Sequence, residues 1–277
     1  MRGCACHTTE GFAHVSCLAE QAKILVAEAA ENNLEIPPRW MRWNMCSLCE
    51  QEYHGVVSCA LGWACWKTYL GRSETDDTRL SAMGQLGNGL SEANLNEDAL
   101  PVKEAELSML RRLGASEEYI LVAQSNLAIT YESLGRFVEA QSMFRDVHSG
   151  TSKLCGEEHE RTLLVAYNYA DSLVALQQWE EARSLLHKTT PVTRRVLGES
   201  HRLTLKMRMN YAETLYKDDN ATLDDLREAV EMLEDAERTA RRVFGSSYPL
   251  AAGIGRSLRD ARAVLRAREV PSASGAV

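Results

Sequence analysis

Residues 125–147 read SNLAITYESLGRFVEAQSMFRDV, and this stretch decides the fold that we expect. Apolar and small residues recur in it at the three- to four-residue spacing of a helix face, once before Gly135 and once after it. They are Leu127, Ala128 and Tyr131 in the first segment and Ala140, Phe144 and Val147 in the second. Small residues let two helices approach closely, while aromatic side chains fill the space between them. The stretch therefore predicts two packed helices joined by a turn at Gly135.

The same pattern recurs along the chain at a nearly fixed period. Three asparagines, each two positions before a small residue, keep a step of 42 residues: Asn126, Asn168 and Asn210. Glycines at the ends of successive units follow one another at steps of 42, 42 and 47 residues: Gly114, Gly156, Gly198 and Gly245. A period of this size is typical of a solenoid of stacked helix pairs. The chain beyond about residue 71 is therefore predicted to be all-α.

The repeat spacing resembles that of the tetratricopeptide repeat. The long period, Leu-Gly-Glu-x-His at residues 197–201 and Gly-Arg-x-x-Glu-Ala at residues 135–140 resemble the kinesin light chain version of it. The resemblance covers residues 79–266 and implies an α-α superhelix of about four helix pairs plus a capping helix. Pro101 is expected to kink or delay one helix, and a five-residue insertion around residues 217–223 is expected to lengthen one loop. The repeat domain is placed at residues 72–269, and a disordered tail is expected at residues 270–277.

The composition limits the kind of protein this can be. The net charge of −8 argues against nucleic-acid binding as the main activity, since that needs clustered Lys and Arg. The most apolar run, residues 56–66, is about half the length that spans a bilayer, so no membrane span is expected. The start of the chain lacks the basic and apolar segments of a signal peptide. We therefore expect a cytoplasmic protein, in which closely spaced cysteines indicate a metal before a disulfide.

Residues 1–71 hold seven of the eight cysteines and are expected to form a small zinc-finger domain. Six potential zinc ligands stand there in an ordered series: Cys4, Cys6, His14, Cys17, Cys46 and Cys49. Ligands one to four residues apart can wrap a single ion, and a closed tetrahedral zinc site takes four of them. A count of six therefore means that ligands are missing or that one site is incomplete. Buried ordinary thiols are the alternative to zinc.

The series resembles the RING-CH (RINGv) finger of membrane-associated ubiquitin ligases. The matching residues are Gly-Cys-Ala-Cys at 3–6, Gly-Phe-Ala-His-Val-Ser-Cys-Leu at 11–18, and Cys-Ser-Leu-Cys at 46–49 followed by Tyr53. The resemblance implies a complete zinc site of Cys4, Cys6, Cys46 and Cys49 and a half site of His14 and Cys17. Its two missing ligands would precede Met1, so the chain is expected to be an N-terminally truncated form. Ligands from another chain, or a finger with one zinc, are the alternatives.

Fingers of this family hold a ubiquitin-conjugating enzyme, and the resemblance makes Trp40 and Trp43 the candidates for that contact. The alternative is that both tryptophans pack against the finger or against a helix expected over residues 18–33. Residues 56–69 are expected to form a buried helix that docks the finger on the repeats. The alternative is that Cys59 and Cys65 in this segment extend the metal binding.

The first helices of stacked repeats are expected to line a concave groove. Candidate groove residues are Asn126, Asn168 and Asn210, together with Tyr167, Asp171, Met209 and Glu213. A ladder of amides can bond a peptide backbone without demanding one sequence. The acidic and apolar neighbours favour a peptide with basic and hydrophobic residues. The alternative is that each asparagine bonds the backbone of a neighbouring helix.

No nucleophile and base pair, phosphate loop or metal-dependent active site can be recognised in the repeats. We therefore expect a zinc-binding adaptor whose repeats recruit a protein or peptide, and which is ubiquitin-ligase-like in a longer form that restores the missing ligands. The alternative is a non-catalytic scaffold that resembles the cargo-binding repeats of kinesin light chain.

Overall fold

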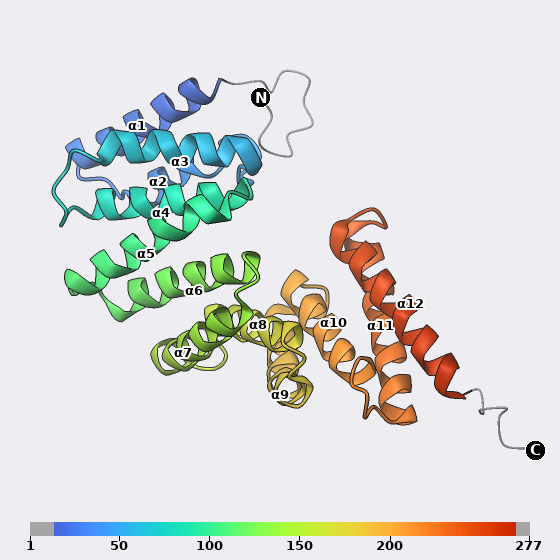
Figure 1. Ribbon diagram of the computed structural model, residues 1–277. Coiled ribbons are helices and arrows are strands. Elements are labelled where there is room, and N and C mark those ends of the chain that lie inside the picture. The colour runs from blue at the N-terminus through green and yellow to red at the C-terminus, as the bar shows by residue number, and fades with distance from the viewer. Residues whose placement is uncertain (1–13, 270–277) are drawn as a thin grey trace, which may run out of the picture. The chain divides into compact units, whose positions relative to one another are not determined.

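The computed structural model of the protein describes residues 14–269 and divides into two compact units. The first unit ends at Arg136 and the second begins at Phe137. Over the described residues the secondary structure is helical, apart from one isolated antiparallel bridge between Met45 and Glu52. The described chain is therefore all-α, as the repeat period predicted (Figure 1). The tail expected at residues 270–277 lies outside the described residues.

The helices of the first unit include two that touch backbone to backbone. They are α1 (Val15–Glu31), α2 (Pro37–Trp40), the short 3₁₀ helix η1 (Met41–Trp43), α3 (Gly55–Tyr69), α4 (Asp77–Glu92), α5 (Asn96–Arg112) and α6 (Glu117–Ser133). A Cβ added to Gly62 of α3 would lie 2.9 Å from the carbonyl oxygen of Gln85, and one added to Gly89 of α4 would lie 2.7 Å from that of Ser58. Only glycine permits so close an approach. The chain therefore packs continuously from α3 into α4.

The starts of α4 and α5 follow from local sequence. Asp76 begins α4, because its carboxylate accepts hydrogen bonds from the backbone N–H groups of Thr78 at 2.9 Å and Arg79 at 3.2 Å. Helix α5 begins at Asn96, before Pro101, so of the two expected effects the proline does not delay the start of the helix. A proline removes a single backbone donor, and the other bonds of the helix carry it through to its end.

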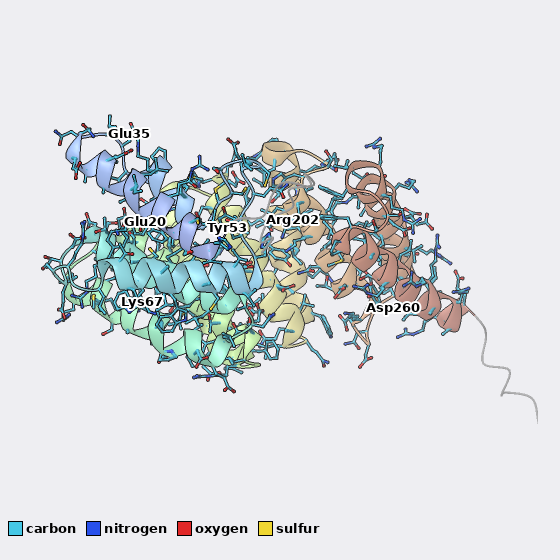
Figure 2. All side chains as sticks on the ribbon, turned by 90° about the horizontal axis from the view of Figure 1, so that it is seen from above. Glu20, Glu35, Tyr53, Lys67, Arg202 and Asp260 are labelled. Atoms are coloured by element: carbon cyan, nitrogen blue, oxygen red, sulfur yellow. The ribbon has the colours of Figure 1, made fainter. Side chains whose placement is uncertain are left out.

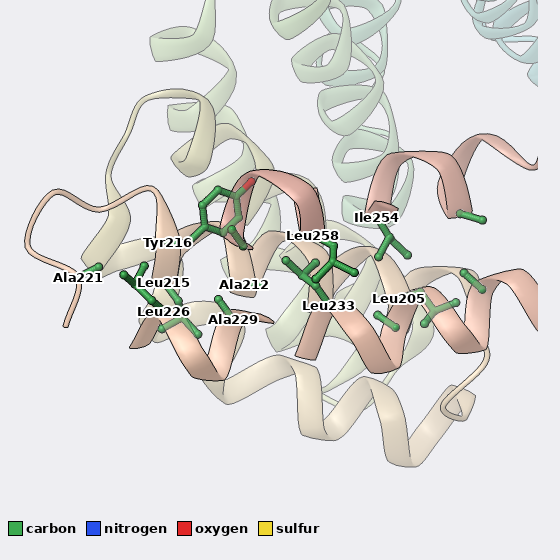
Figure 3. Packing of buried hydrophobic residues seen from close by; sticks show 14 residues of the cluster. Leu205, Ala212, Leu215, Tyr216, Ala221, Leu226, Ala229, Leu233, Ile254 and Leu258 are labelled. Atoms are coloured by element: carbon green, nitrogen blue, oxygen red, sulfur yellow. The ribbon is translucent and has the colours of Figure 1, made fainter. Parts of the chain in front are cut away.

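Within residues 137–269, the described part of the second unit, there are three helix pairs. They are α7 (Phe137–Cys155) with α8 (Glu160–Ala175), α9 (Trp179–Leu197) with α10 (Arg202–Tyr216), and α11 (Leu223–Phe244) with α12 (Pro249–Glu269). Buried leucines, alanines and an isoleucine from α10, α11 and α12 interlock in its core, including Leu205, Ala212, Leu226, Leu233, Ile254 and Leu258 (Figure 3). Alanines at the contact positions let the three helices approach closely.

The Leu-Gly-Glu-x-His sequence closes the turn before α10. Gly198 has φ of +94°, a conformation that glycine adopts without strain. The Nδ1 atom of His201 accepts a hydrogen bond from the backbone N–H of Leu203 at 3.2 Å, and the hydroxyl of Thr204 donates to the carbonyl of Gly198 at 2.8 Å. The same contacts recur one repeat earlier, before α8, at Gly156, His159 and Thr162. The repeated motif is therefore a turn and helix cap rather than a binding signature.

The five-residue insertion lengthens the loop between α10 and α11, as predicted. Thr222 and Asp225 begin α11 with a reciprocal pair of cap bonds. Arg268 of α12 holds the loop from the other side, because its guanidinium donates to the carbonyl oxygens of Asp219 at 2.9 Å and Ala221 at 3.2 Å.

Charged side chains cover the outward faces of the helices, as Glu20 of α1, Lys67 of α3 and Asp260 of α12 illustrate (Figure 2). None of the helices in residues 14–269 combines the length and the apolar content that a membrane crossing requires.

Candidate functional site

A pocket of about 320 Å³ lies between α8 and α10 in the second unit. Its lining comes from both helices: Glu160, Leu164, Tyr167, Asn168, His201, Arg202, Leu203 and Lys206. Tyr167 and Asn168 are two of the groove residues predicted from the sequence. The structure therefore brings part of the predicted groove to one concave site.

The pocket carries positive charge on an aromatic wall. The Nζ atom of Lys206 lies 4.8 Å from the centre of the Tyr167 ring, an arrangement in which the ring face attracts the cation. Burial lowers the pKa of Lys206, the nearby guanidinium of Arg202 lowers it further, and Asp171 opposes both. Arg202 projects from the first turn of α10 (Figure 2). An anion placed in this pocket would relieve the repulsion between the two cations.

Asn210, the third predicted ladder residue, is buried and bonds a neighbouring helix. Its side-chain amide donates to the carboxylate of Asp171 on α8 at 2.7 Å, and only 2% of the residue is exposed. Burial raises the pKa of Asp171, and the bond from Asn210 opposes that rise. The pair therefore joins two helices and is not presented to a ligand.

The same bond recurs one repeat later. Ser257 of α12 occupies the position of Asn210, and its hydroxyl donates to the carboxylate of Glu213 on α10 at 3.0 Å. Glu213 also forms an ion pair with Lys217 at 2.7 Å. We call these bonds, Asn210 to Asp171 and Ser257 to Glu213, the inter-helix rungs. Met209, which was also predicted for the groove, packs instead against the apolar core formed by α10, α11 and α12.

The corresponding positions of the first unit line a pocket of about 260 Å³. Its polar lining includes Asn44, Gln85, Asn88, Ser91, Lys103 and Asn126. Gln85 fills the position that asparagine holds in the later repeats. The match is hard to see in the sequence, because Gln85 precedes Asn126 by 41 residues and not by the 42 of the other steps. No hydrogen bond joins Asn88 to Asn126 in the described part of the chain, so no rung forms here.

A buried lysine connects the helices of this pocket instead. The Nζ atom of Lys103 donates to Ser91 Oγ at 2.9 Å, Thr130 Oγ1 at 2.9 Å and the carbonyl oxygen of Asn126 at 3.2 Å, which joins α4, α5 and α6. Burial lowers the pKa of Lys103 to about 8. It likewise raises the pKa of Glu106, one turn further along α5, to about 7. Lys103 could not be recognised from the sequence, because a lone lysine is normally a surface residue.

The two tryptophans proposed for an enzyme contact lie in the interior of the first unit. Trp43 is fully buried, and its ring centre lies 6.1 Å from that of Tyr69. Trp40 is partly buried, with its ring centre 5.4 Å from the same tyrosine. Cys65 and Val26 pack in this cluster. The packing alternative therefore describes both residues, and Trp43 offers no surface to a partner.

Cys46 and Cys49 flank a tight turn. The backbone N–H of Leu48 lies 3.4 Å from the sulfur of Cys46, and the N–H of Glu50 donates to the Cys46 carbonyl at 3.0 Å. Glu50 has φ of +55°, which lets the chain reverse directly after the second cysteine. Both cysteines pack against the start of α1. The turn thus holds two sulfur atoms beside an exposed helix end.

The other predicted zinc ligands are only partly described. Cys4 and Cys6 lie outside the described residues. His14 precedes the first turn of α1, Cys17 lies within that turn, and both are exposed. Within residues 14–269 no three His, Cys, Asp or Glu side chains are grouped closely enough to hold a metal ion. The zinc site stays a prediction.

Comparison with known proteins identifies the repeats. The tetratricopeptide repeat family matches twice, over residues 120–161 and over residues 161–242. Residues 120–242 are tetratricopeptide repeats. No curated protein matches the sequence of this chain.

Several solved structures have a fold similar to that of this chain. A putative kinesin light chain of nearly identical TPR-like repeats from Podosopora anserina has a TM-score of 0.55 and 20% identity, over 83% of this chain and 98% of that chain. BtubC from P. vanneervenii has a TM-score of 0.53 and 14% identity, over 96% and 98% of the two chains. A Rap protein complexed with Competence and Sporulation Factor has a TM-score of 0.51 and 16% identity, over 77% and 60%. The tetratricopeptide-like, all-α repeat fold is therefore confirmed.

Proposed function

We propose that this protein is a non-catalytic adaptor whose tetratricopeptide repeats hold an extended segment of a partner protein. The pocket between α8 and α10 carries this proposal, because it sets exposed apolar surface on Leu164 beside the cations of Lys206 and Arg202. A related fold, that of the Rap protein, is complexed with Competence and Sporulation Factor. Helical repeats of this kind therefore provide a precedent for holding a separate ligand.

Two cations, Lys206 and Arg202, outnumber the one lining carboxylate, Glu160, and this balance favours a segment that carries an acidic residue next to an apolar one. Asp171 and Glu213 had suggested a basic ligand, but the inter-helix rungs engage both carboxylates. Lys206 and Arg202 form no ion pair in the described structure, whereas an acidic side chain could pair with either. The favoured partner segment is thus acidic and apolar.

Selection from a phage-displayed library of random peptides, with the full chain as bait, tests this proposal. We expect enrichment of peptides with an Asp or Glu beside an apolar residue. Lys206→Gln should raise the Kd of such peptides about tenfold or more, because it removes one partner of a half-buried charge pair. Lys153→Gln, which removes an exposed lysine of α7, is the matched control and should leave Kd unchanged. Equal Kd values for the two variants would contradict the proposal.

A second proposal concerns zinc in the first unit. We infer that Cys46 and Cys49 supply two thiolates of a zinc site completed by Cys4 and Cys6, as the RING-CH resemblance implies. The turn at Cys46 supports this, because a backbone N–H that points at the sulfur stabilises a thiolate ligand and fixes its orientation. Bound zinc would act structurally there, by cross-linking the turn to the preceding residues.

Zinc content tests this second proposal directly. The purified full chain should contain about one zinc ion, which Cys46→Ser removes and Cys155→Ser retains. Metal-free protein with an intact N-terminus would overturn it. Ubiquitin-ligase-like activity would require a form in which the half site of His14 and Cys17 is also complete, and a conjugating-enzyme surface other than Trp43. Autoubiquitination by such a longer form is the corresponding measurement.

A further inference from the structure

A second pocket of the second unit lies on different helix faces from the groove. It has a volume of about 470 Å³ and is formed by α9 and α11, with α10 beneath them. Its apolar floor and walls are Leu186, Pro191, Tyr211 and Met232. Leu186 is fully buried, so the floor is a fixed part of the core.

The cations that line this pocket are already neutralised. Arg208 pairs with Asp235 at 2.8 Å and with Glu199 at 3.7 Å, and its side chain is only 12% exposed. Arg194 pairs with Glu199 at 3.2 Å. Each guanidinium is therefore held by carboxylates of the protein itself and is not free to bind an anion.

Two carboxylates of the pocket, by contrast, have no partner. Glu228 and Glu231 lie one turn apart on the exposed side of α11, and neither forms an ion pair or side-chain hydrogen bond in the described part of the chain. Two uncompensated negative charges beside an apolar floor attract a cation more strongly than either does alone. The remaining charge of the pocket is thus negative.

An unpaired acceptor on α9 points to the same kind of ligand. Pro191 has no N–H, so the carbonyl of His187 lacks the donor that would continue the helix. Both residues line the pocket. A ligand with N–H donors would satisfy this carbonyl.

We propose that this pocket binds an arginine side chain displayed by a partner protein. The guanidinium carries five N–H donors and a permanent charge, which suits two carboxylates together with a neutral acceptor. The aliphatic stem of the arginine lies on Pro191 and Met232. This site takes a basic residue, whereas the pocket between α8 and α10 takes an acidic one, and the two proposals stand independently.

The test titrates the full chain with N-acetyl-Leu-Arg-Leu-amide and follows the ¹³C-labelled methyl of Met232 by NMR. The matched probe carries citrulline in place of arginine, which keeps the shape and removes the charge. Glu228→Gln with Glu231→Gln should raise the Kd of the arginine probe about tenfold, since each half-exposed pair is worth up to ~1 kcal/mol. The citrulline probe should bind the unchanged protein about tenfold more weakly than the arginine probe.

The control variant is Glu180→Gln with Asp219→Asn, which removes two exposed carboxylates outside the pocket. Its Kd should stay within about twofold of the unchanged protein, and circular dichroism should show equal helicity for both double variants. Equal binding of the arginine and citrulline probes would overturn the proposal. So would equal Kd values for the two double variants, or binding of a lysine probe as tight as that of the arginine probe.

Discussion

The two units differ at one repeat position, because the inter-helix rungs form in the second unit, although Asn168 of that unit lines a pocket as Asn126 does in the first. In the second unit, the side chains of Asn210 and Ser257 donate hydrogen bonds to the carboxylates of Asp171 and Glu213, each on the first helix of the preceding repeat. In the first unit, Asn126 borders a pocket, Gln85 is buried and donates to the carbonyl of Trp43 at 3.4 Å, and Lys103 joins α4, α5 and α6. The residue three positions further along differs as well: Asp171 and Glu213 are carboxylates, whereas Asn88 is a neutral amide and a weaker acceptor. Recurrence of a polar residue therefore does not by itself indicate a ligand.

The largest expected effect separates Asn210 from Asn126. Asn210→Ala should lower the free energy of unfolding by about 2–3 kcal/mol, because it leaves the buried carboxylate of Asp171 without its donor. Asn126→Ala should lower it by less than about 1 kcal/mol, since its side chain borders an open pocket. Urea denaturation of both variants provides the measurement. Equal losses would erase the distinction between the units.

A smaller effect appears in the pH dependence of the first unit. Lys103 has a pKa of about 8 in the folded chain, below its ordinary value of 10.5. Stability that is fully present above pH 10.5 is therefore lost as the pH falls through about 8. The free energy of unfolding should rise by about 2 kcal/mol between pH 8 and pH 10. Lys103→Met should remove this rise, and an unaltered pH profile in that variant would contradict the role given to the lysine.

The smallest effect distinguishes the two rungs from each other. Ser257→Ala should lower the free energy of unfolding by only about 1 kcal/mol, because Glu213 keeps Lys217 as a second partner. A double-mutant cycle with Glu213→Gln should give a coupling energy smaller than the cycle of Asn210 with Asp171→Asn. A larger coupling for Ser257 would reverse the proposed order of the rungs.

The repeat architecture was readable from the sequence because its signals are local. The 42-residue step, the glycine turns and the insertion before α11 all reappear as helix ends and loops. Gln85 was missed because a single missing residue shifts the first repeat out of register. The partnership of Asn210 with Asp171 spans 39 residues and depends on how two helices pack. Nothing in a single sequence marks two residues 39 positions apart as hydrogen-bond partners.

The binding sites were less predictable for a related reason. Tyr167 and Asn168 were found because they recur, whereas Lys206 and Arg202 carry no repeat signal. Glu228 and Glu231 look like ordinary exposed residues of an amphipathic helix until the arginines beside them are seen to be paired. The zinc ligands could be ordered from spacing alone, but two of the four lie outside the described residues.

The hydrogen bonds from Arg268 to the loop at residues 217–222 suggest where this protein can be labelled. Arg268 contacts main-chain oxygens of Asp219 and Ala221, so the identity of the side chains at residues 219 and 220 is irrelevant to it. Both positions are exposed. Residues 219 and 220 could therefore be replaced by a fluorophore attachment site or a short epitope, while the hydrogen bonds from Arg268 to the backbone are kept. The insertion that distinguishes this repeat is a natural handle for tethering the protein to a surface.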